Sequence, residues 1–179
     1  MLPVTDSEEY AVYDAVLNSE YASSKAQELV INTETVSKKG GPFVGLVFGL
    51  AGTGAKPPKV ESGTMSDFKA KGKKSYTLER QFRLKMQYVL RTNDELRPIF
   101  AARTPGHPEE DGWFRFYRNF PQASGINGLS RVGFNSRKDQ ALVFLVHQSS
   151  GLGGTRIFFV LSKSGGTWKI VKRVVMALS

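Results

Sequence analysis

The chain has 179 residues, of which 40% are apolar and 11% aromatic, a composition that supports one domain with a substantial core and argues against disorder. It contains no cysteine, so a disulfide scaffold, a cysteine-ligated zinc finger and a thiol nucleophile are excluded. The formal charge of +9 favours an acidic partner such as nucleic acid, anionic lipid or an anionic wall polymer.

The sequence predicts no transmembrane segment. The longest apolar run, residues 43–51, is shorter than the stretch of about 20 residues that a spanning helix needs. The first ten residues, MLPVTDSEEY, are polar and acidic and lack the pattern of a signal peptide. Localisation is left open, because a cytoplasmic protein and an exported one whose leader was removed would both fit.

Residues 5–27 open the chain with a helical pattern. Thr5 or Asp6 can cap this helix, with Glu8 or Glu9 following as in a capping box. Four side chains then recur at helical spacing on one face: Tyr10, Tyr13, Leu17 and Tyr21. We expect this stripe to face the core.

A strand at 28–36 leads into a long connection at 37–63 that is rich in glycine and proline. Part of it, VFGLAGTGAKPP at 47–58, resembles a phosphate-binding P-loop, which needs G-x-x-x-x-G-K-[ST] before a helix. The two glycines are correctly spaced, but Ala55 precedes the lysine, and the two prolines that follow it have no N–H groups to donate. The sequence therefore excludes a P-loop and predicts that 37–63 is a mobile loop.

The middle of the chain combines short helices with one strand. Residues 64–72 predict a helix of one or two turns. The strand at 81–91 is the clearest in the chain, because apolar side chains at even positions alternate with mostly polar or basic ones. Thr92 begins a capping box and a short helix that is broken near Pro98, and residues 111–121 predict a further helix.

The last third of the chain predicts four strands joined by turn sequences at hairpin spacing: about 126–134, 140–148, 155–163 and 167–175. A helix first, strands later and few strand–helix–strand units are typical of an α+β fold with an antiparallel sheet. We therefore predict a single α+β domain over residues 1–179, with the N-terminal helix packed on a curved antiparallel sheet that ends in a four-strand meander. By fold analogy alone, this arrangement is cystatin-like or NTF2-like.

Residues 129–175, together with GWFRFYRNFP at 112–121 and EYAVYDAVLN at 9–18, resemble a family of bacterial domains that have no known activity. The shared pattern is S-x-V-G-F-N, then Q-A-L-V-[FY], a glycine turn and a closing W-K-[IV]-V strand. Members are often exported, so the resemblance slightly favours a periplasmic or extracellular location. Ser149 and Gly153 stand where the family carries cysteines, which argues against a cysteine-dependent role in this chain.

The strand at 140–148 is apolar until it ends in His147 and Gln148, and this abrupt change marks the candidate ligand site. A turn with three glycines follows and permits close approach of a ligand to the backbone. Arginines reach the same edge if the hairpins pair as predicted. An anion or a small-molecule carboxylate would then bind at six residues: Arg131, His147, Gln148, Ser149, Ser150 and Arg156. The plain alternative is a hairpin turn whose glycines only satisfy the backbone conformation.

Two other kinds of chemistry are less favoured. A Ser–His pair at His147 could support acyl transfer, although no G-x-S-x-G elbow and no obvious acidic partner occurs. His107, with Glu109, Glu110 and Asp111, could bind a divalent ion, but acidic residues ahead of a helix are explained by the helix dipole. We expect neither a metal nor a cofactor.

Basic residues gather in three places: near 69–74, on the strand at 81–91 and at 169–173. RNA-binding sheets place aromatic side chains among the basic ones on the exposed face, whereas the aromatic residues of 81–91 take the other face. The sequence therefore favours a non-enzymatic binding or interaction domain for an anionic or small-molecule ligand. A nucleic-acid-binding module with a basic sheet face is one alternative, and an enzyme with a site near His147 is a second.

Overall fold

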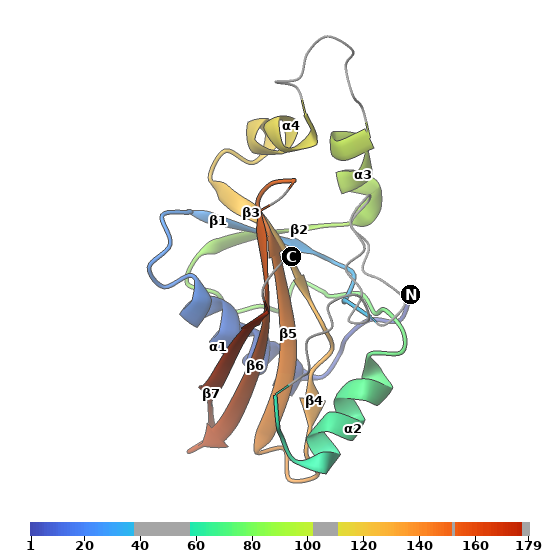
Figure 1. Ribbon diagram of the computed structural model, residues 1–179, viewed down its shortest axis with the longest axis vertical. Coiled ribbons are helices and arrows are strands. Elements are labelled where there is room, and N and C mark those ends of the chain that lie inside the picture. The colour runs from blue at the N-terminus through green and yellow to red at the C-terminus, as the bar shows by residue number, and fades with distance from the viewer. Residues whose placement is uncertain (38–57, 102–110, 152, 177–179) are drawn as a thin grey trace.

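The computed structural model has an α+β architecture (Figure 1), and it describes residues 1–37, 58–101, 111–151 and 153–176. Within these residues there are four helices: α1 (Ser7–Glu20), α2 (Ser62–Lys71), α3 (Asn93–Ala101) and α4 (Gly112–Asn119). The same residues form seven strands: β1 (Glu28–Asn32), β2 (Gln87–Arg91), β3 (Ala123–Leu129), β4 (Gly133–Phe134), β5 (Gln140–Gln148), β6 (Gly154–Ser164) and β7 (Thr167–Met176). None of these helices is long and apolar enough to cross a membrane.

The strands form one open, mixed sheet. Six of them run in the order β2–β1–β3–β5–β6–β7, and the short β4 pairs with β5. The meander from β3 to β7 is antiparallel, as predicted. The prediction of a wholly antiparallel sheet is wrong, because β1 lies parallel to both β2 and β3. Connections that contain helices precede β2 and β3, and such crossovers let a strand enter the sheet in the same direction as its neighbour.

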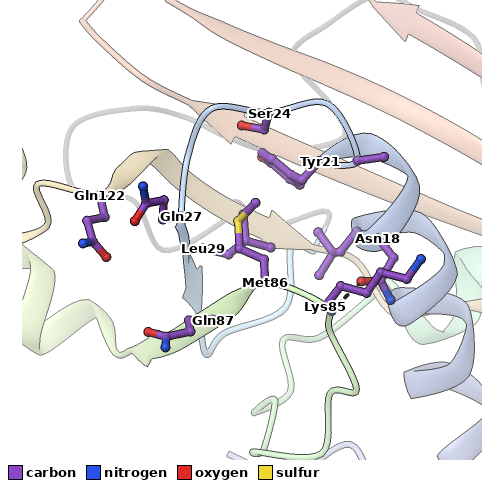
Figure 2. Close-up of a pocket in the computed structure, with 11 residues that line it drawn as sticks. Asn18, Tyr21, Ser24, Gln27, Leu29, Lys85, Met86, Gln87 and Gln122 are labelled. Carbon is purple, nitrogen blue, oxygen red and sulfur yellow. Dashed lines mark hydrogen bonds between the residues drawn. The ribbon is translucent and has the colours of Figure 1, made fainter.

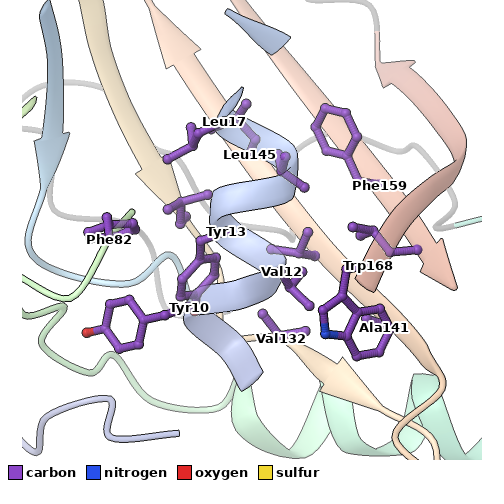
Figure 3. Close-up of a cluster of buried hydrophobic side chains, with 14 of the residues drawn as sticks. Tyr10, Val12, Tyr13, Leu17, Phe82, Val132, Ala141, Leu145, Phe159 and Trp168 are labelled. Carbon is purple, nitrogen blue, oxygen red and sulfur yellow. The ribbon is translucent and has the colours of Figure 1, made fainter. Parts of the chain in front are cut away.

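Helix α1 packs on one face of this sheet (Figure 3). Asp6 caps its first turn, with Oδ1 accepting a hydrogen bond from the Glu8 N–H at 2.9 Å, as the residue preference predicts. The predicted stripe faces the core, since Tyr10, Tyr13 and Leu17 are buried. These side chains belong to one cluster with alternate residues of β5 and β6: Val143, Leu145, Phe159 and Leu161.

The other three helices cover the opposite face in two parts. Helix α2 lies against β4 and β5, and its Phe68 packs on Phe158 with ring centroids 6.0 Å apart. Helices α3 and α4 form a separate cluster with β1 and β3, to which α4 contributes Trp113 and Phe116. Strand β5 is therefore buried on both sides, which explains its continuous apolar sequence at 141–146.

The strand predicted at 81–91 is regular only in its last five residues, which form β2. The preceding residues keep the predicted alternation, with Phe82 buried and Arg83 exposed. They do not pair with a strand, because polar side chains of α1 take up their backbone groups, as the Arg83 N–H shows by donating to Asp14 Oδ1 at 2.8 Å. Buried and exposed side chains thus alternate in the residues before β2, although these residues are not part of the sheet.

Several other boundaries differ from the prediction, and the strand predicted at 28–36, for example, ends at Asn32. Pro98 lies inside α3 and does not break it, because packing of Leu96 and Ile99 against α4 and the sheet outweighs one lost backbone hydrogen bond. Helix α2 begins at Ser62, inside the predicted loop, since Met65 and Phe68 anchor it on the sheet. The stretch 38–57, which holds most of the predicted mobile loop and of the P-loop-like sequence, lies outside the described residues.

Phe82 should be a major contributor to stability. Its ring lies 5.1 Å from the Tyr10 ring and 5.5 Å from the Tyr88 ring, measured between centroids, so it joins α1 to β2. We expect Phe82→Ala to lower the free energy of unfolding by about 3 to 5 kcal/mol. The neighbouring exposed Arg83→Ala should change it by about 0.5 kcal/mol. Urea melts of both variants measure this, and the opposite ranking would overturn the assigned facing.

Candidate functional site

A pocket of about 710 Å³ opens beside the C-terminal end of helix α1 (Figure 2). Its walls come from the last turn of α1, the segment that leads into β1, the beginnings of β1 and β2, the residues just before β2 and the residue just before β3. Asn18 and Lys85 lie on one side, and three glutamines lie on the other: Gln27, Gln87 and Gln122.

The three glutamines converge because three parallel strands begin at the same edge of the sheet. Gln87 starts β2 and lies opposite Glu28, which starts β1. Glu28 also lies opposite Ala123, which starts β3. Gln27 and Gln122 immediately precede these two residues, and the Gln27 N–H donates to the Gln122 carbonyl at 3.0 Å. Strand pairing thus brings together three side chains that are far apart in the sequence.

Polar side chains of α1 position the opposite wall. Asn18 Oδ1 accepts a hydrogen bond from the Lys85 N–H at 2.8 Å, and Asn18 Nδ2 donates to the Arg83 carbonyl at 3.3 Å. Asp14 of α1 likewise accepts a hydrogen bond from the Arg83 N–H. Side chains of α1 thus bond the backbone of residues 83–85, as a neighbouring strand would in a sheet. The helix therefore fixes where Lys85 and Met86 lie.

The pocket combines apolar side chains with polar groups that lack partners. Leu17 and Leu29 are buried at its base, and Met86 packs against the same core cluster. The Lys85 ammonium and the three glutamine amides have no hydrogen-bond or ion-pair partner among the described residues. Of the described residues that line the pocket, none is acidic and Lys85 is the one cation. Such a lining suits a small polar ligand that carries negative charge.

Tyr21 connects this pocket to a polar cluster on the sheet. Its ring lines the pocket, while its hydroxyl lies 2.9 Å from His147 Nδ1 and hydrogen-bonds to Asn127 Oδ1. His147 Nδ1 is also 3.3 Å from Asn127 Oδ1. Asn127 and His147 lie opposite each other on β3 and β5, so the sheet register sets this contact. Burial raises the pKa of Tyr21, which keeps the hydroxyl a hydrogen-bond donor.

Two opposing effects act on the proton of His147. Burial disfavours the charged ring and lowers the pKa of His147 below 6.5, although the negative charge of Glu20 and a hydrogen bond to the Ser124 backbone favour the charged form. Burial is the larger effect, so His147 is neutral at pH 7.

Only glycine fits at position 125, next to this cluster. Gly125 has φ of 141°, a conformation that side chains rarely allow. A Cβ atom there would lie 2.2 Å from the Gln148 carbonyl oxygen and 2.9 Å from His147 Cε1. The backbone of β3 therefore approaches the imidazole directly and closes the cluster on that side.

The structure does not bring Arg131 to the end of the sheet where His147 lies. The Arg131 guanidinium binds the buried Glu9 carboxylate, with Nη2 to Oε1 at 2.6 Å, and stacks 4.2 Å from the Tyr76 ring centroid. Glu9 lies in the first turn of α1, whereas His147 contacts Tyr21 at the other end of that helix. Strand β3 ends at Leu129, and even a continued β3–β5 register would set Arg131 opposite Val143, four residues from His147.

The predicted glycine turn uses its own polar groups. The N–H groups of Ser149 and Ser150 donate to the Gly153 carbonyl at 2.9 and 3.1 Å, and Gln148 Nε2 donates to the Ser150 carbonyl at 3.0 Å. Tyr117 of α4 donates to the Ser149 carbonyl at 2.8 Å. The backbone N–H groups of Ser149 and Ser150 therefore point into the loop.

The residues of the predicted site also occupy different faces. The His147 side chain contacts Tyr21 at the end of α1, whereas Gln148 is paired in register with Ile126, which packs in the cluster with α4. Arg156 is paired in register with Val146, whose side chain belongs to the cluster under α2. Successive side chains of a strand point to opposite faces, and this alternation separates His147 from Gln148 and Arg156.

Sequence reasoning missed the glutamines of the pocket. Gln27, Gln87 and Gln122 belong to no motif, and their convergence depends on parallel pairings that the sequence pattern did not predict. Among the described residues, no group of three or more His, Asp or Glu side chains could hold a metal ion. His107, Glu109 and Glu110 lie outside the described residues.

Comparison with known proteins found no matching family model, no matching curated protein and no matching solved structure. The fold and the chemistry of the pocket therefore rest on the structure of this chain.

The lowered pKa of His147 predicts a specific pH dependence of stability. The unfolded chain takes up a proton at His147 as the pH falls through about 6.5, whereas the folded protein does so only at lower pH. Between these two values the unfolded state binds more protons, so the free energy of unfolding should fall as the pH falls. Each unit of lowering corresponds to about 1.4 kcal/mol.

Urea melts between pH 7.5 and pH 4.5 measure this effect. In His147→Gln, which keeps a hydrogen-bonding side chain beside Tyr21, the decline below pH 6.5 should be smaller than in the wild type. His107→Gln removes the only other histidine in the chain and serves as the matched control. An unchanged decline in His147→Gln would show that the pKa of His147 is not lowered by folding.

Proposed function

We propose that this protein is a non-enzymatic binding domain that takes up a small anionic ligand in the pocket at the C-terminal end of α1. One observation carries the proposal: the Lys85 ammonium and three glutamine amides, none of which has a partner among the described residues, surround a cavity of about 710 Å³ with an apolar base. An ammonium without a counter-ion attracts an anion, and amide groups orient it. This places the proposed site at residues different from those that the sequence favoured.

A binding role is supported over catalysis by the surroundings of His147. Its ring nitrogen Nδ1 meets Tyr21 and Asn127, and none of the hydrogen bonds or ion pairs within the described parts of the chain joins it to a carboxylate or to a serine hydroxyl. Nucleophilic catalysis by a Ser–His pair needs the serine hydroxyl and the imidazole within hydrogen-bond reach of each other. His147 and Asn127 instead hold the Tyr21 side chain in place.

Nucleic-acid binding is less well supported than small-anion binding. The basic face expected on the strand at 81–91 is interrupted, because Arg91 pairs with Glu95 at 3.7 Å and lies over the Phe120 ring. In the basic run at 69–74, Lys71 is engaged by Asp67 at 2.9 Å. Both contacts remove positive charge that a phosphate backbone would need.

We also propose a more specific fold for the chain. A helix packed on an antiparallel meander, with a pocket at one end of the helix, supports a cystatin-like or NTF2-like relationship. The parallel pairing of β1 with β2 and β3 is a feature that the analogy did not anticipate. Membership of the bacterial family that residues 129–175 resemble is likewise a hypothesis, and analogy of fold carries no function.

Amide chemical shifts recorded with a panel of small anions test the proposal. The panel contains acetate, citrate, inorganic phosphate and D-glucuronate. At least one should shift the amide signals of Gln27, Lys85 and Gln87 in a saturable way. Lys85→Gln should weaken that binding about tenfold, which is roughly the 1.4 kcal/mol expected for one charge-assisted hydrogen bond.

Lys172→Gln provides the matched control, because Lys172 is exposed on β7 and has no ion pair among the described residues. It removes the same charge without touching the pocket, so it should bind the ligand as the wild type does. Equal weakening in both variants, or shifts spread over the whole basic surface, would contradict the proposed site. Tight, strongly salt-dependent binding of a single-stranded oligonucleotide would favour the nucleic-acid alternative.

A further inference from the structure

We infer that the ligand of this pocket is a hydroxylated monoanion of sugar-acid type, with a ring or chain that bears several hydroxyl groups and one carboxylate. The inference rests on the proposed function and specifies the chemical class that the same site would select. Three properties of the lining carry it: its amides, its apolar strip and its single charge.

The amides favour hydroxyl groups over a bare anion. Each glutamine side chain offers two N–H donors and one carbonyl acceptor, and Gln27, Gln87 and Gln122 use none of these within the described structure. A simple carboxylate provides only acceptors and inorganic phosphate at most two O–H donors, so either would leave carbonyl oxygens of the three exposed glutamines paired with water alone. A hydroxyl group donates and accepts at one atom, so neighbouring hydroxyl groups can pair with both ends of each amide.

The apolar strip suits the carbon skeleton of such a molecule. Between the glutamines and Lys85, Figure 2 shows Leu29 and Met86 at the centre of the pocket, with the Tyr21 side chain at its border. Tyr21 is held by Asn127 and His147, so its ring is fixed before a ligand arrives. The C–H groups of a sugar ring form an apolar face that packs on an aromatic or thioether surface.

The charge of the pocket sets the charge of the ligand. Among the described residues that line the pocket, Lys85 is the one cation, and its backbone is fixed by Asn18. A cationic ligand would face this ammonium without a carboxylate to balance it, and a ligand with two or more negative charges would bring an anion for which the pocket supplies no second cation. One negative charge matches the described lining.

Three ring compounds separate these contributions: D-glucuronate, D-glucose and cyclohexanecarboxylate. The first has hydroxyl groups and a carboxylate, the second lacks the charge and the third lacks the hydroxyl groups. Isothermal titration on the intact protein should give a Kd for glucuronate at least about tenfold lower than for either of the others. Gln87→Met and Gln122→Met should weaken glucuronate about tenfold and leave cyclohexanecarboxylate unchanged. Gln81→Met, an exposed glutamine outside this pocket, is the matched control.

The outcomes separate the inference from the function it rests on. If cyclohexanecarboxylate binds as tightly as glucuronate, the hydroxyl selectivity is refuted, while anion binding at the pocket stands. Equal binding of glucose refutes the role of charge. If acetate, citrate or phosphate binds at the pocket and glucuronate does not, the ligand class is wrong. If no anion binds there, both the inference and the proposed function fall.

Discussion

The buried carboxylate of Glu9 is the interaction around which this fold is organised. Its side chain is 0% exposed and lies in the first turn of α1. It binds the Arg131 guanidinium through both oxygens and accepts hydrogen bonds from the Val132 N–H at 3.0 Å and from the Tyr13 hydroxyl at 3.2 Å. Lys71 Nζ, at the end of α2, lies 3.5 Å away. One carboxylate thus joins α1, α2 and the segment between β3 and β4.

Such an arrangement is stable only as a complete set. A buried charge is costly to desolvate, and the cost is offset only when a counter-charge and hydrogen bonds satisfy it. Burial acts to lower the pKa of Arg131, but the hydrogen bonds and charge of Glu9 outweigh it and raise that pKa. The pair therefore favours one position of α1 on the sheet, because a shift of the helix would separate the Glu9 carboxylate from the Arg131 guanidinium. Glu9 thereby fixes the N-terminal half of α1.

The pocket depends on the same helix at its other end. Tyr21 ties that end to β3 and β5 through Asn127 and His147, and Glu20 pairs with Arg173 of β7 at 2.6 Å. Between the two anchors, α1 holds the segment before β2 through Asn18. With both ends of the helix fixed, the space beside its last turn remains as a cavity and is not closed by packing.

Local patterns predicted the parts of the molecule that local chemistry determines. The Asp6 cap, the Tyr10 stripe, the capping box of Thr92 with Glu95 and the antiparallel meander follow from spacing and residue type, and each is present. Parallel pairing of β1 is set by tertiary packing and leaves no periodic signal in a strand of five residues. The convergence of the glutamines at one sheet edge was therefore not predictable.

The burial of Glu9 was equally hidden, because a glutamate in the first turn of a helix is usually explained by the helix dipole. The sequence predicted a role for Arg131 on the basis of its charge, and the structure gives it a partner in the core instead. The charge pattern thus identified Arg131 as an important residue. Glu9, the partner that determines its role, is 122 positions away in the sequence.

The most direct test of this account is a double-mutant cycle on Glu9 and Arg131. Glu9→Gln, Arg131→Gln and the double variant are compared with the wild type by urea unfolding, with the exposed pair Arg137 and Asp139 as a reference. We expect Arg131→Gln alone to cost about 3 to 5 kcal/mol, because it leaves a buried carboxylate without its main partner. The double variant should be more stable than the sum of the single changes predicts by about 2 kcal/mol or more, whereas the exposed pair should show a much smaller coupling. Single effects at Glu9 and Arg131 that simply add, within about 0.5 kcal/mol, would show that the fold does not depend on this interaction.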